Sequence, residues 1–242
     1  MKAMKTFLFD LGNTRLKYAA LAADGHLGET TAISHDAGLA WLDDLPRGDV
    51  ACIASVGTAA RHAALLGALT ARFTRLHVVR TQPALGRLQI AYANPQHLGV
   101  DRFLAMLAAL DAGPVLLVGV GTALTCDLLD GEGQHRGGRI APSPSLMREA
   151  LHARAPGLPE RGGTYAEFAD DTHHALVSGC DGAALALVER SLAEAQKLLG
   201  VRPTLWLHGG GAQALRAQLP VHAWVPDSVL RGVALWHAKC IA

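Results

Sequence analysis

A glycine turn near the start of the chain is surrounded by side chains that could bind a charged ligand. In FLFDLGNTRLKYAAL, residues 7–21, an apolar run ends at Asp10, turns through Gly12, and resumes with cations at Arg15 and Lys17. A hairpin needs a turn residue such as glycine, but it does not need a carboxylate, a hydroxyl and two cations around that turn. Taken alone, the stretch is as typical of a solvated β-turn as of a binding loop.

The same pattern occurs a second time in the middle of the chain. Aligning Gly12 with Gly121 matches residues 7–21 to LLVGVGTALTCDLL, residues 116–129, as strand, glycine turn with a threonine, and alternating strand. Each copy continues with an Asp-Gly turn, at residues 24–25 and 130–131, and with another candidate strand, at 26–33 and 135–141. The repeat predicts two duplicated lobes that face each other. Chance similarity of two glycine hairpins is the alternative.

The predicted fold is therefore α/β, with two duplicated lobes of mixed sheet and flanking helices. We place the N-terminal lobe at residues 1–112 and the C-terminal lobe at 113–242, because Gly113 suits a helix C-cap and Pro114 begins the next strand. The second lobe ends with a strand that runs into glycines 209–211 and then into a predicted helix. Amides at such a turn can accept an anion or a nucleoside edge, although a tight strand-to-helix turn is the simpler interpretation.

Composition narrows the class of protein. The chain has 242 residues, 50% of them apolar, and a formal charge of +1 without a basic stripe, which argues against a nucleic acid partner. Four widely spaced cysteines indicate buried thiols in a reducing compartment. The N-terminus reaches Asp10 too soon for a signal peptide, and the longest apolar run falls short of the roughly 20 residues of a membrane helix. We expect a cytoplasmic protein without a membrane partner.

Common nucleotide-binding motifs are absent from the sequence. No GxxxxGK[ST] pattern occurs, and GVGTAL lacks the third glycine of the dinucleotide fingerprint and continues like a strand. The two hairpins remain, with glycine and threonine tips that could hold a polyphosphate between them. Thr14 and Thr122 offer hydroxyls, Lys17 offers charge, and Asp10 is placed to hold a Mg²⁺ carried by a nucleotide, directly or through water.

An acid and a guanidinium lie side by side at the predicted start of a helix. In YANPQHLGVDRFLAMLAALDAG, residues 92–113, Asp101 and Arg102 follow Gly99 and precede an apolar stripe. Asp is a favoured N-cap, and that role alone could explain Asp101. The pair also suits a substrate with a hydroxyl to deprotonate and a carboxylate to hold, and we favour this functional interpretation.

Six motifs occur in the order found in type III pantothenate kinases: DLGNTRLK, LGVDR, VGVGTALT, GGRIAPS, DTHHALVSG and LHGGGA. The resemblance covers nearly the whole chain and implies the acetate and sugar kinase/heat-shock 70/actin superfold, an actin-like ATPase (ribonuclease H-like) fold. It implies a homodimeric enzyme that phosphorylates pantothenate to 4'-phosphopantothenate, the first step of coenzyme A biosynthesis, with ATP and Mg²⁺. A non-catalytic regulatory accessory factor on the same scaffold is the alternative, although the pair Asp10 and Asp101 favours catalysis.

The resemblance also implies residue roles. Asp101 is the base, Asp10 lies near the nucleotide-bound Mg²⁺, and Thr172 contacts pantothenate from the other subunit, unless it only caps its helix. The first phosphate loop is Asp10, Leu11, Gly12, Asn13, Thr14, Arg15, Leu16 and Lys17; Gly121 and Thr122 are the second ATP contact; and the pantothenate pocket contains Tyr92, Gly99, Val100, Asp101 and Arg102.

Three positions depart from the family pattern, and one of them is APSPS, residues 141–145, where a proline-glycine often follows GGRI. Gly119 stands where the family usually has a carboxylate that holds K⁺ or NH₄⁺, and His208 stands where a threonine is usual. Either the cation site is lost, or backbone carbonyls, water and neighbouring residues hold K⁺ more loosely. The resemblance therefore leaves the response to monovalent cations undecided.

Overall fold

The computed structural model describes residues 4–241 and divides into two compact units. The first contains the chain up to Asp111 together with the segment from Asp227 onward, and the second is Ala112–Pro226. The division after Asp111 lies one residue before the break expected from Gly113. The C-terminal segment differs from the expectation, because the sequence assigned it to the second lobe. Helix α5 (Ser228–Cys240) packs instead against α2 (Val100–Ala109) and the sheet of the first unit.

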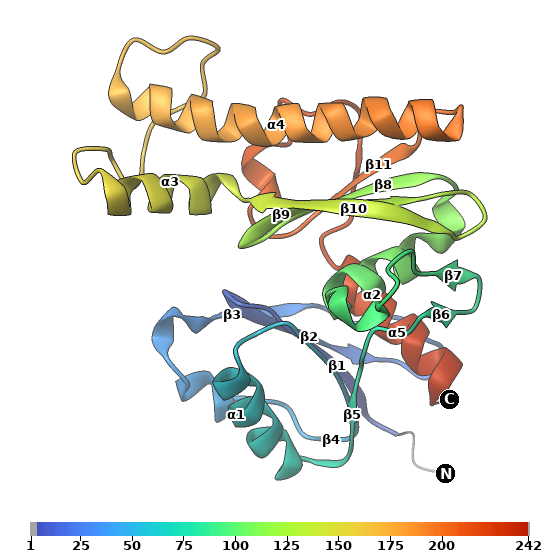
Figure 1. The fold of residues 1–242 in the computed structure, drawn as a ribbon. Coiled ribbons are helices and arrows are strands. Elements are labelled where there is room, and N and C mark those ends of the chain that lie inside the picture. Colours follow the sequence, from blue (N-terminus) through green and yellow to red (C-terminus); the bar gives the residue numbers. More distant parts are fainter. Residues whose placement is uncertain (1–3, 242) are drawn as a thin grey trace. The chain divides into compact units, whose positions relative to one another are not determined.

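The first unit is built on a five-stranded mixed sheet with the order β3-β2-β1-β4-β5 (Figure 1). Strand β1 pairs antiparallel with β2, and β2 with β3, while β4 runs parallel to both β1 and β5. The strands are β1 (Thr6–Leu11), β2 (Arg15–Leu21), β3 (Thr31–Ser34), β4 (Gly48–Ser55) and β5 (Phe73–Val78).

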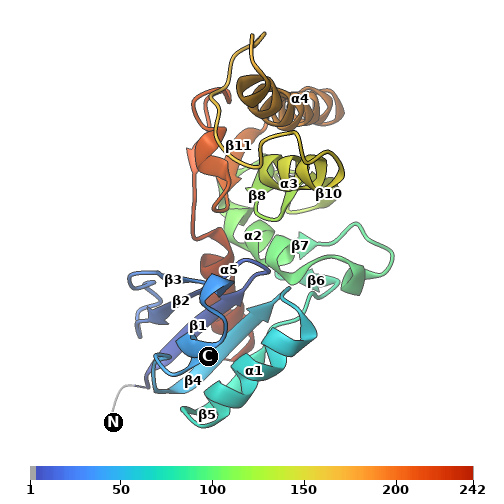
Figure 2. The same ribbon diagram turned by 90° about the vertical axis from the view of Figure 1, so that its left-hand side faces the viewer.

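Alternation along β1 decides which side chains face which layer of the first unit. Phe9 and Leu11 are fully buried in a core that includes Leu65 and Leu69 of α1 (Ala59–Thr70). Successive strand residues point to opposite faces, so Asp10 points away from α1. Helix α5 contacts β1, β2 and β4, and α2 contacts β4, on the side of the sheet away from α1 (Figure 2). The carboxylate of Asp10 therefore faces the layer of α2 and α5.

The second unit repeats this sheet. Its strand order is β10-β9-β8-β11-β12, with two antiparallel pairs followed by two parallel pairs, as in the first unit. The identical order and directions confirm the predicted duplication of mixed-sheet lobes. The strands are β8 (Val115–Val120), β9 (Ala123–Leu129), β10 (His135–Pro142), β11 (Thr204–His208) and β12 (Ala223–Trp224).

Helix α4 (Thr172–Leu199) covers one face of the second sheet. Its buried residues, including Leu185, Val188 and Leu192, pack on alternate residues of β8 and β9. The helix ends at Gly200, whose φ of 70° is a left-handed conformation that glycine adopts without strain. Helix α3 (Pro144–Arg154) precedes it and begins at Ser143, whose hydroxyl accepts a hydrogen bond from the Leu146 N–H at 3.3 Å.

Shorter elements complete the chain. The hairpin β6 (Ala84–Leu85) and β7 (Leu88–Gln89) precedes α2, and 3₁₀ helices are η1 (His35–Ala37), η2 (Ala40–Leu42), η3 (Pro95–His97), η4 (Leu110–Ala112) and η5 (Ala212–Ala214). The helix predicted after the glycines 209–211 is only η5, so this turn is not the N-terminus of an α-helix.

Within residues 4–241, no helix is both long and apolar enough to cross a membrane. Three cysteines are buried as expected, but Cys240 is exposed.

Candidate active site

Asp10 is the centre of a group of charges in the first unit. It lies directly opposite Lys17 in the β1–β2 ladder, so the two side chains share one face of the sheet. Burial and the carboxylate of Asp101 raise the pKa of Asp10 from 3.8 to about 7, Lys17 opposes the rise, and Asp227 adds to it. Such a shift at a partly buried acid beside like charges is typical of functional sites.

Asp101 is not the N-cap of α2. The N-cap is Gly99, and Asp101 lies in the first turn, where its Oδ1 accepts a hydrogen bond from the Arg102 N–H at 2.9 Å. The capping alternative for Asp101 is therefore wrong. A Cβ on Gly99 would lie 2.5 Å from this Oδ1, so only glycine lets the carboxylate fold back against the backbone here. The helix dipole favours negative charge at this end, which suits a base that must be ionised.

Arg102 and Tyr92, both predicted at the substrate pocket, lie together in the structure. Arg102 is only 6% exposed, and its Nη1 donates to the Tyr92 hydroxyl at 3.3 Å. The guanidinium carbon lies 5.8 Å from the centroid of the Tyr92 ring, within the range of a cation–π contact. Val100 is buried, so its side chain belongs to the core and only its backbone is available to a ligand.

Asp227 is a member of this group that the sequence interpretation missed. Its Oδ1 lies 3.8 Å from the Lys17 Nζ. Asp227 also occupies the N-cap position of α5, where its side chain makes no capping bond. Helix α5 comes close to α2 because Gly232 lies against the Leu104 carbonyl, where a Cβ would collide at 2.1 Å. The residues 226–228, Pro-Asp-Ser, indicate a helix start, but nothing local indicates that Asp227 joins β1 and β2.

The first hairpin contains both buried and exposed members of the predicted phosphate loop. Leu11 and Leu16 are fully buried, so these two members of the predicted phosphate loop contribute only main-chain groups. Asn13, Thr14 and Arg15 are exposed at the tip. The turn is closed by a hydrogen bond from the Gly12 N–H to the Arg15 carbonyl at 3.1 Å.

The second hairpin has a shorter tip in the second unit. Gly121 and Thr122 are both exposed there, and the Gly121 N–H donates to the Ala123 carbonyl at 2.9 Å. Gly119 lies second from the end of β8, as Asp10 lies second from the end of β1. The duplication therefore places Gly119 at the position that carries the carboxylate in the first unit.

Gly119 and His208, two of the departures from the family pattern, lie next to each other. His208 is opposite Gly119 in the parallel β8–β11 register. A Cβ on Gly119 would lie 2.9 Å from the His208 ring and 2.8 Å from the Thr125 hydroxyl. The imidazole and the Thr125 hydroxyl thus occupy the space beside residue 119, which accounts for the presence of glycine there.

Thr172 is the exposed first residue of α4. The residue that caps the helix is Asp171, whose side chain accepts a hydrogen bond from the His174 N–H at 3.0 Å. The alternative that Thr172 serves only as the cap is therefore wrong, and its exposed side chain is available to another molecule.

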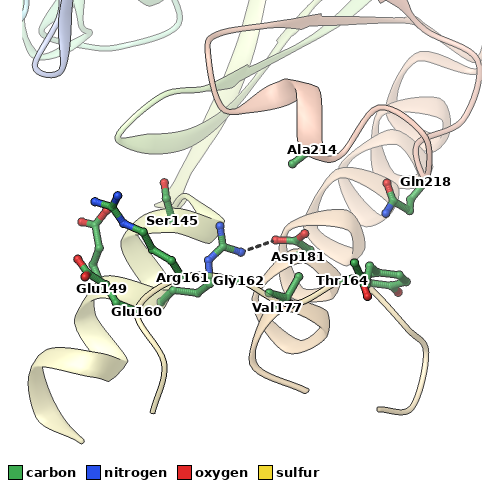
Figure 3. A pocket seen from close by; sticks show the side chains of 13 residues that line it. Ser145, Glu149, Glu160, Arg161, Gly162, Thr164, Val177, Asp181, Ala214 and Gln218 are labelled. Carbon is green, nitrogen blue, oxygen red and sulfur yellow. Dashed lines mark hydrogen bonds and ion pairs between the residues drawn. The ribbon is translucent and has the colours of Figure 1, made fainter. Parts of the chain in front are cut away.

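The second unit also contains a cavity of about 450 Å³ (Figure 3). Its polar lining includes Arg148 of α3, whose guanidinium donates to the Asp181 carboxylate of α4 at 3.0 Å. Burial raises the pKa of Asp181, and the Arg148 charge opposes the rise. None of the residues predicted at the active site lines this cavity.

The described residues fit a metal that arrives with its nucleotide. Among residues 4–241, no group of three or more His, Cys, Asp and Glu side chains is arranged to hold a metal ion. Mg²⁺ in kinases usually takes one or two carboxylates, several waters and the substrate phosphates, so Asp10 beside a glycine hairpin is an adequate protein contribution.

Comparison with solved structures defines the fold. A protein assigned to the Baf family of transcriptional activators from Campylobacter jejuni superposes with a TM-score of 0.64 at 18% identity, covering 96% of this chain and 98% of the other. A protein described as a 2-dehydro-3-deoxygalactonokinase from Sinorhizobium meliloti gives a TM-score of 0.55 at 15% identity, covering 98% and 100%. With the duplicated mixed sheets, these similarities identify the duplicated-lobe fold of the actin-like ATPases.

Sequence comparison identifies the family. The model of the type III pantothenate kinase family matches residues 6–194. The type III pantothenate kinases of Stenotrophomonas maltophilia (strain K279a) and Xanthomonas campestris pv. campestris (strain B100) are 55% and 53% identical to the chain, covering 96% of it and 97% of each relative. The chain belongs to the type III pantothenate kinase family.

Proposed function

We propose that this protein transfers the γ-phosphoryl group of ATP to the primary hydroxyl of pantothenate and forms 4'-phosphopantothenate, the first step of coenzyme A biosynthesis. Family membership supports the reaction. The main support in this chain is the Asp101 carboxylate, which is not at the N-cap position of α2 and lies close enough to Asp10 to raise the pKa of that residue. A binding protein has no need of two mutually repelling carboxylates.

Each side chain has a proposed role in the transfer. The pantothenate hydroxyl oxygen attacks the γ-phosphorus, the bond from that phosphorus to the bridging oxygen of ADP breaks, and Asp101 accepts the hydroxyl proton. Arg102, held by Tyr92, binds the pantothenate carboxylate. The hairpin Asp10–Lys17 binds phosphate groups, and Gly121 and Thr122 make the second contact with ATP. Mg²⁺, when bound through Asp10, neutralises negative charge on the phosphates.

A coupled assay of ADP release tests this function. We expect ADP to form only when both MgATP and pantothenate are present, with one 4'-phosphopantothenate for each ADP. A folded protein that binds ATP but forms no product from pantothenate would favour the non-catalytic accessory factor instead.

We further propose that the enzyme responds only weakly to K⁺ or NH₄⁺. Gly119 supplies no anionic ligand, and removal of one carboxylate weakens a cation site. Turnover measured against KCl, at constant ionic strength balanced by a bulky organic cation, should rise little or only at high K⁺. Steep activation that saturates at low K⁺ would contradict the proposal.

Because the His208 ring lies beside Gly119, a test of this proposal by substitution must also change His208. Gly119→Asp alone would push the carboxylate into the His208 ring, and overpacking of this kind costs about 1–3 kcal/mol. We expect the single variant to lose stability, and the double variant Gly119→Asp/His208→Thr to regain it and to gain K⁺ activation. His208→Thr alone is the matched control and should leave the K⁺ response weak.

The proposed active unit is a homodimer in which Thr172 reaches the pantothenate site of the other subunit. The exposure of Thr172 and its freedom from the capping role support this assignment. Asp101→Asn and a Thr172→Val variant with impaired pantothenate binding should each be nearly inactive, and verified hybrid dimers of the two should regain activity because one site is then intact. Verified hybrids without recovered activity would show that the site is not shared.

A further inference from the structure

Four consecutive carbonyl groups of the first hairpin accept hydrogen bonds from other parts of the first unit. The Leu11 carbonyl accepts from the N–H groups of Val56 and Gly57 at 2.9 and 3.1 Å. The Gly12 carbonyl lies 3.1 Å from the Nε2 of His35, and the Thr14 carbonyl accepts from the His35 N–H at 3.0 Å. Four consecutive carbonyls are fixed in this way once Arg61 is included.

Arg61 supplies the remaining bond. It lies in the first turn of α1, and its Nη1 donates to the Asn13 carbonyl at 2.8 Å, across a large separation in sequence. The Asn13 side chain is exposed at the tip, so this guanidinium holds a residue whose own side chain packs little against the fold.

Fixed carbonyls determine where the amides point. In a trans peptide the C=O of one residue and the N–H of the next point in opposite directions. The bond from His35 to the Gly12 carbonyl therefore turns the Asn13 N–H away from His35, and the bond from Arg61 turns the Thr14 N–H away from Arg61. Oriented amides at a glycine turn form a concave site for anions.

His35 is suited to a fixed donor role. Its side chain is buried, and its ring lies 5.6 Å from the Trp41 ring. Burial and the Arg61 charge lower the pKa of His35 from its usual value, so the ring is neutral at pH 7. A carbonyl oxygen only accepts, so the single proton is on Nε2, and the buried Nδ1 has no hydrogen-bond partner among the described residues.

We propose that His35 and Arg61 are positioning residues that hold the Gly12–Thr14 loop in the conformation that binds the phosphates of MgATP. The inference rests on the proposed kinase function, because it assigns the anion held by this hairpin. Neither residue accepts or donates a proton in the reaction. Their contribution is affinity for the nucleotide, which separates them from Asp101.

Two variants remove the side-chain hydrogen bonds and are chosen to keep the packing. His35→Phe keeps the buried ring beside Trp41 and deletes the Nε2 donor, and Arg61→Met keeps much of the side-chain volume and deletes the guanidinium. We expect the KM for MgATP to rise about tenfold in each, a factor that corresponds to about 1.4 kcal/mol, close to the usual value of one hydrogen bond. The KM for pantothenate and the kcat at saturating MgATP should stay within about threefold of the wild-type values.

Matched controls come from the same unit. Arg72→Met also deletes a guanidinium that donates to backbone carbonyls, but these are the carbonyls of Ala68 and Asp43, which do not belong to the hairpin. His77→Phe replaces a half-buried histidine of β5. Both controls should leave the KM for MgATP unchanged. His35 is buried and cannot touch the nucleotide, so the His35→Phe result also excludes direct charge attraction as the cause.

Calorimetry with the Mg²⁺ complex of the β,γ-imido analogue of ATP separates this inference from the proposed reaction. Weaker binding of the analogue by folded His35→Phe and Arg61→Met supports the positioning role even if pantothenate is not the acceptor. Binding and KM for MgATP within twofold of wild type, or equal rises in the KM of both substrates, would overturn it. If His35→Phe does not fold, Arg61→Met against Arg72→Met decides.

Discussion

Asp101→Asn is expected to lower turnover by about 10²- to 10⁴-fold, the usual contribution of a positioned acid–base group, with little change in pantothenate affinity and no loss of stability. Asn has the same shape and keeps a side-chain oxygen that can accept from the Arg102 N–H at the start of α2. The N-cap is Gly99, so the substitution does not change the residue at the N-cap position. The measurement is steady-state kinetics in both substrates, together with thermal unfolding of the two proteins.

The control for this prediction is Asp111→Asn. Asp111 also ends in a carboxylate of the first unit, but it is fully exposed and pairs with Arg87 at 2.8 Å. Both variants change the formal charge equally, so a loss of turnover confined to Asp101→Asn cannot come from net charge. Turnover of Asp101→Asn within a few-fold of wild type would remove Asp101 from the role of base.

The duplicated framework could be predicted from sequence because its signals are local. A glycine turn between an apolar strand and an alternating strand is visible in residues 7–21 and 116–129, and both became the first hairpin of a sheet with the same strand order. The position of Asp101 at the start of a helix, two residues after Gly99, could be predicted for the same reason. The residues that surround Asp101 in space could not be predicted, because they depend on the packing of whole helices.

The residues that sequence interpretation missed are supplied by elements distant in the chain. Asp227 reaches Lys17 because α5 returns to the first unit and crosses α2 closely at Gly232. His208 meets Gly119 only through the register of two parallel strands. No local pattern predicts a register or a helix crossing, since both depend on which apolar faces cover each other.

Asp10→Asn is expected to make the ligand-free protein more stable at pH 8 while lowering turnover by roughly 10²-fold or more, the scale observed when one group that stabilises transition-state charge is removed. Opposite effects on stability and activity are typical of a functional site that is held under electrostatic strain. Asn is isosteric and uncharged, so it removes the cost of burying the carboxylate and the repulsion from Asp101 and Asp227, and it also removes the anionic ligand for Mg²⁺.

The pH dependence of the stability identifies the cause. Burial and the neighbouring carboxylates raise the pKa of Asp10 from 3.8 to about 7, so between these values the folded protein binds a proton that the unfolded chain releases. Stability therefore falls as the pH rises through this window, by as much as about 4 kcal/mol above pH 7 at 1.36 kcal/mol per pKa unit. Asp10→Asn lacks this loss, so its advantage over wild type is largest at pH 8 and disappears near pH 4.

Thermal unfolding at pH 8 and pH 4.5, without nucleotide or Mg²⁺, measures the effect. We expect Asp10→Asn to raise Tm by up to about 8–16 °C at pH 8, since 1 kcal/mol shifts Tm by roughly 2–4 °C in a protein of this size, and to change it little at pH 4.5. Asp44→Asn, at an exposed residue after η2, is the control and should leave Tm unchanged at both pH values. An equal gain at both pH values, or a loss at pH 8, would show that charge repulsion at Asp10 does not strain the fold.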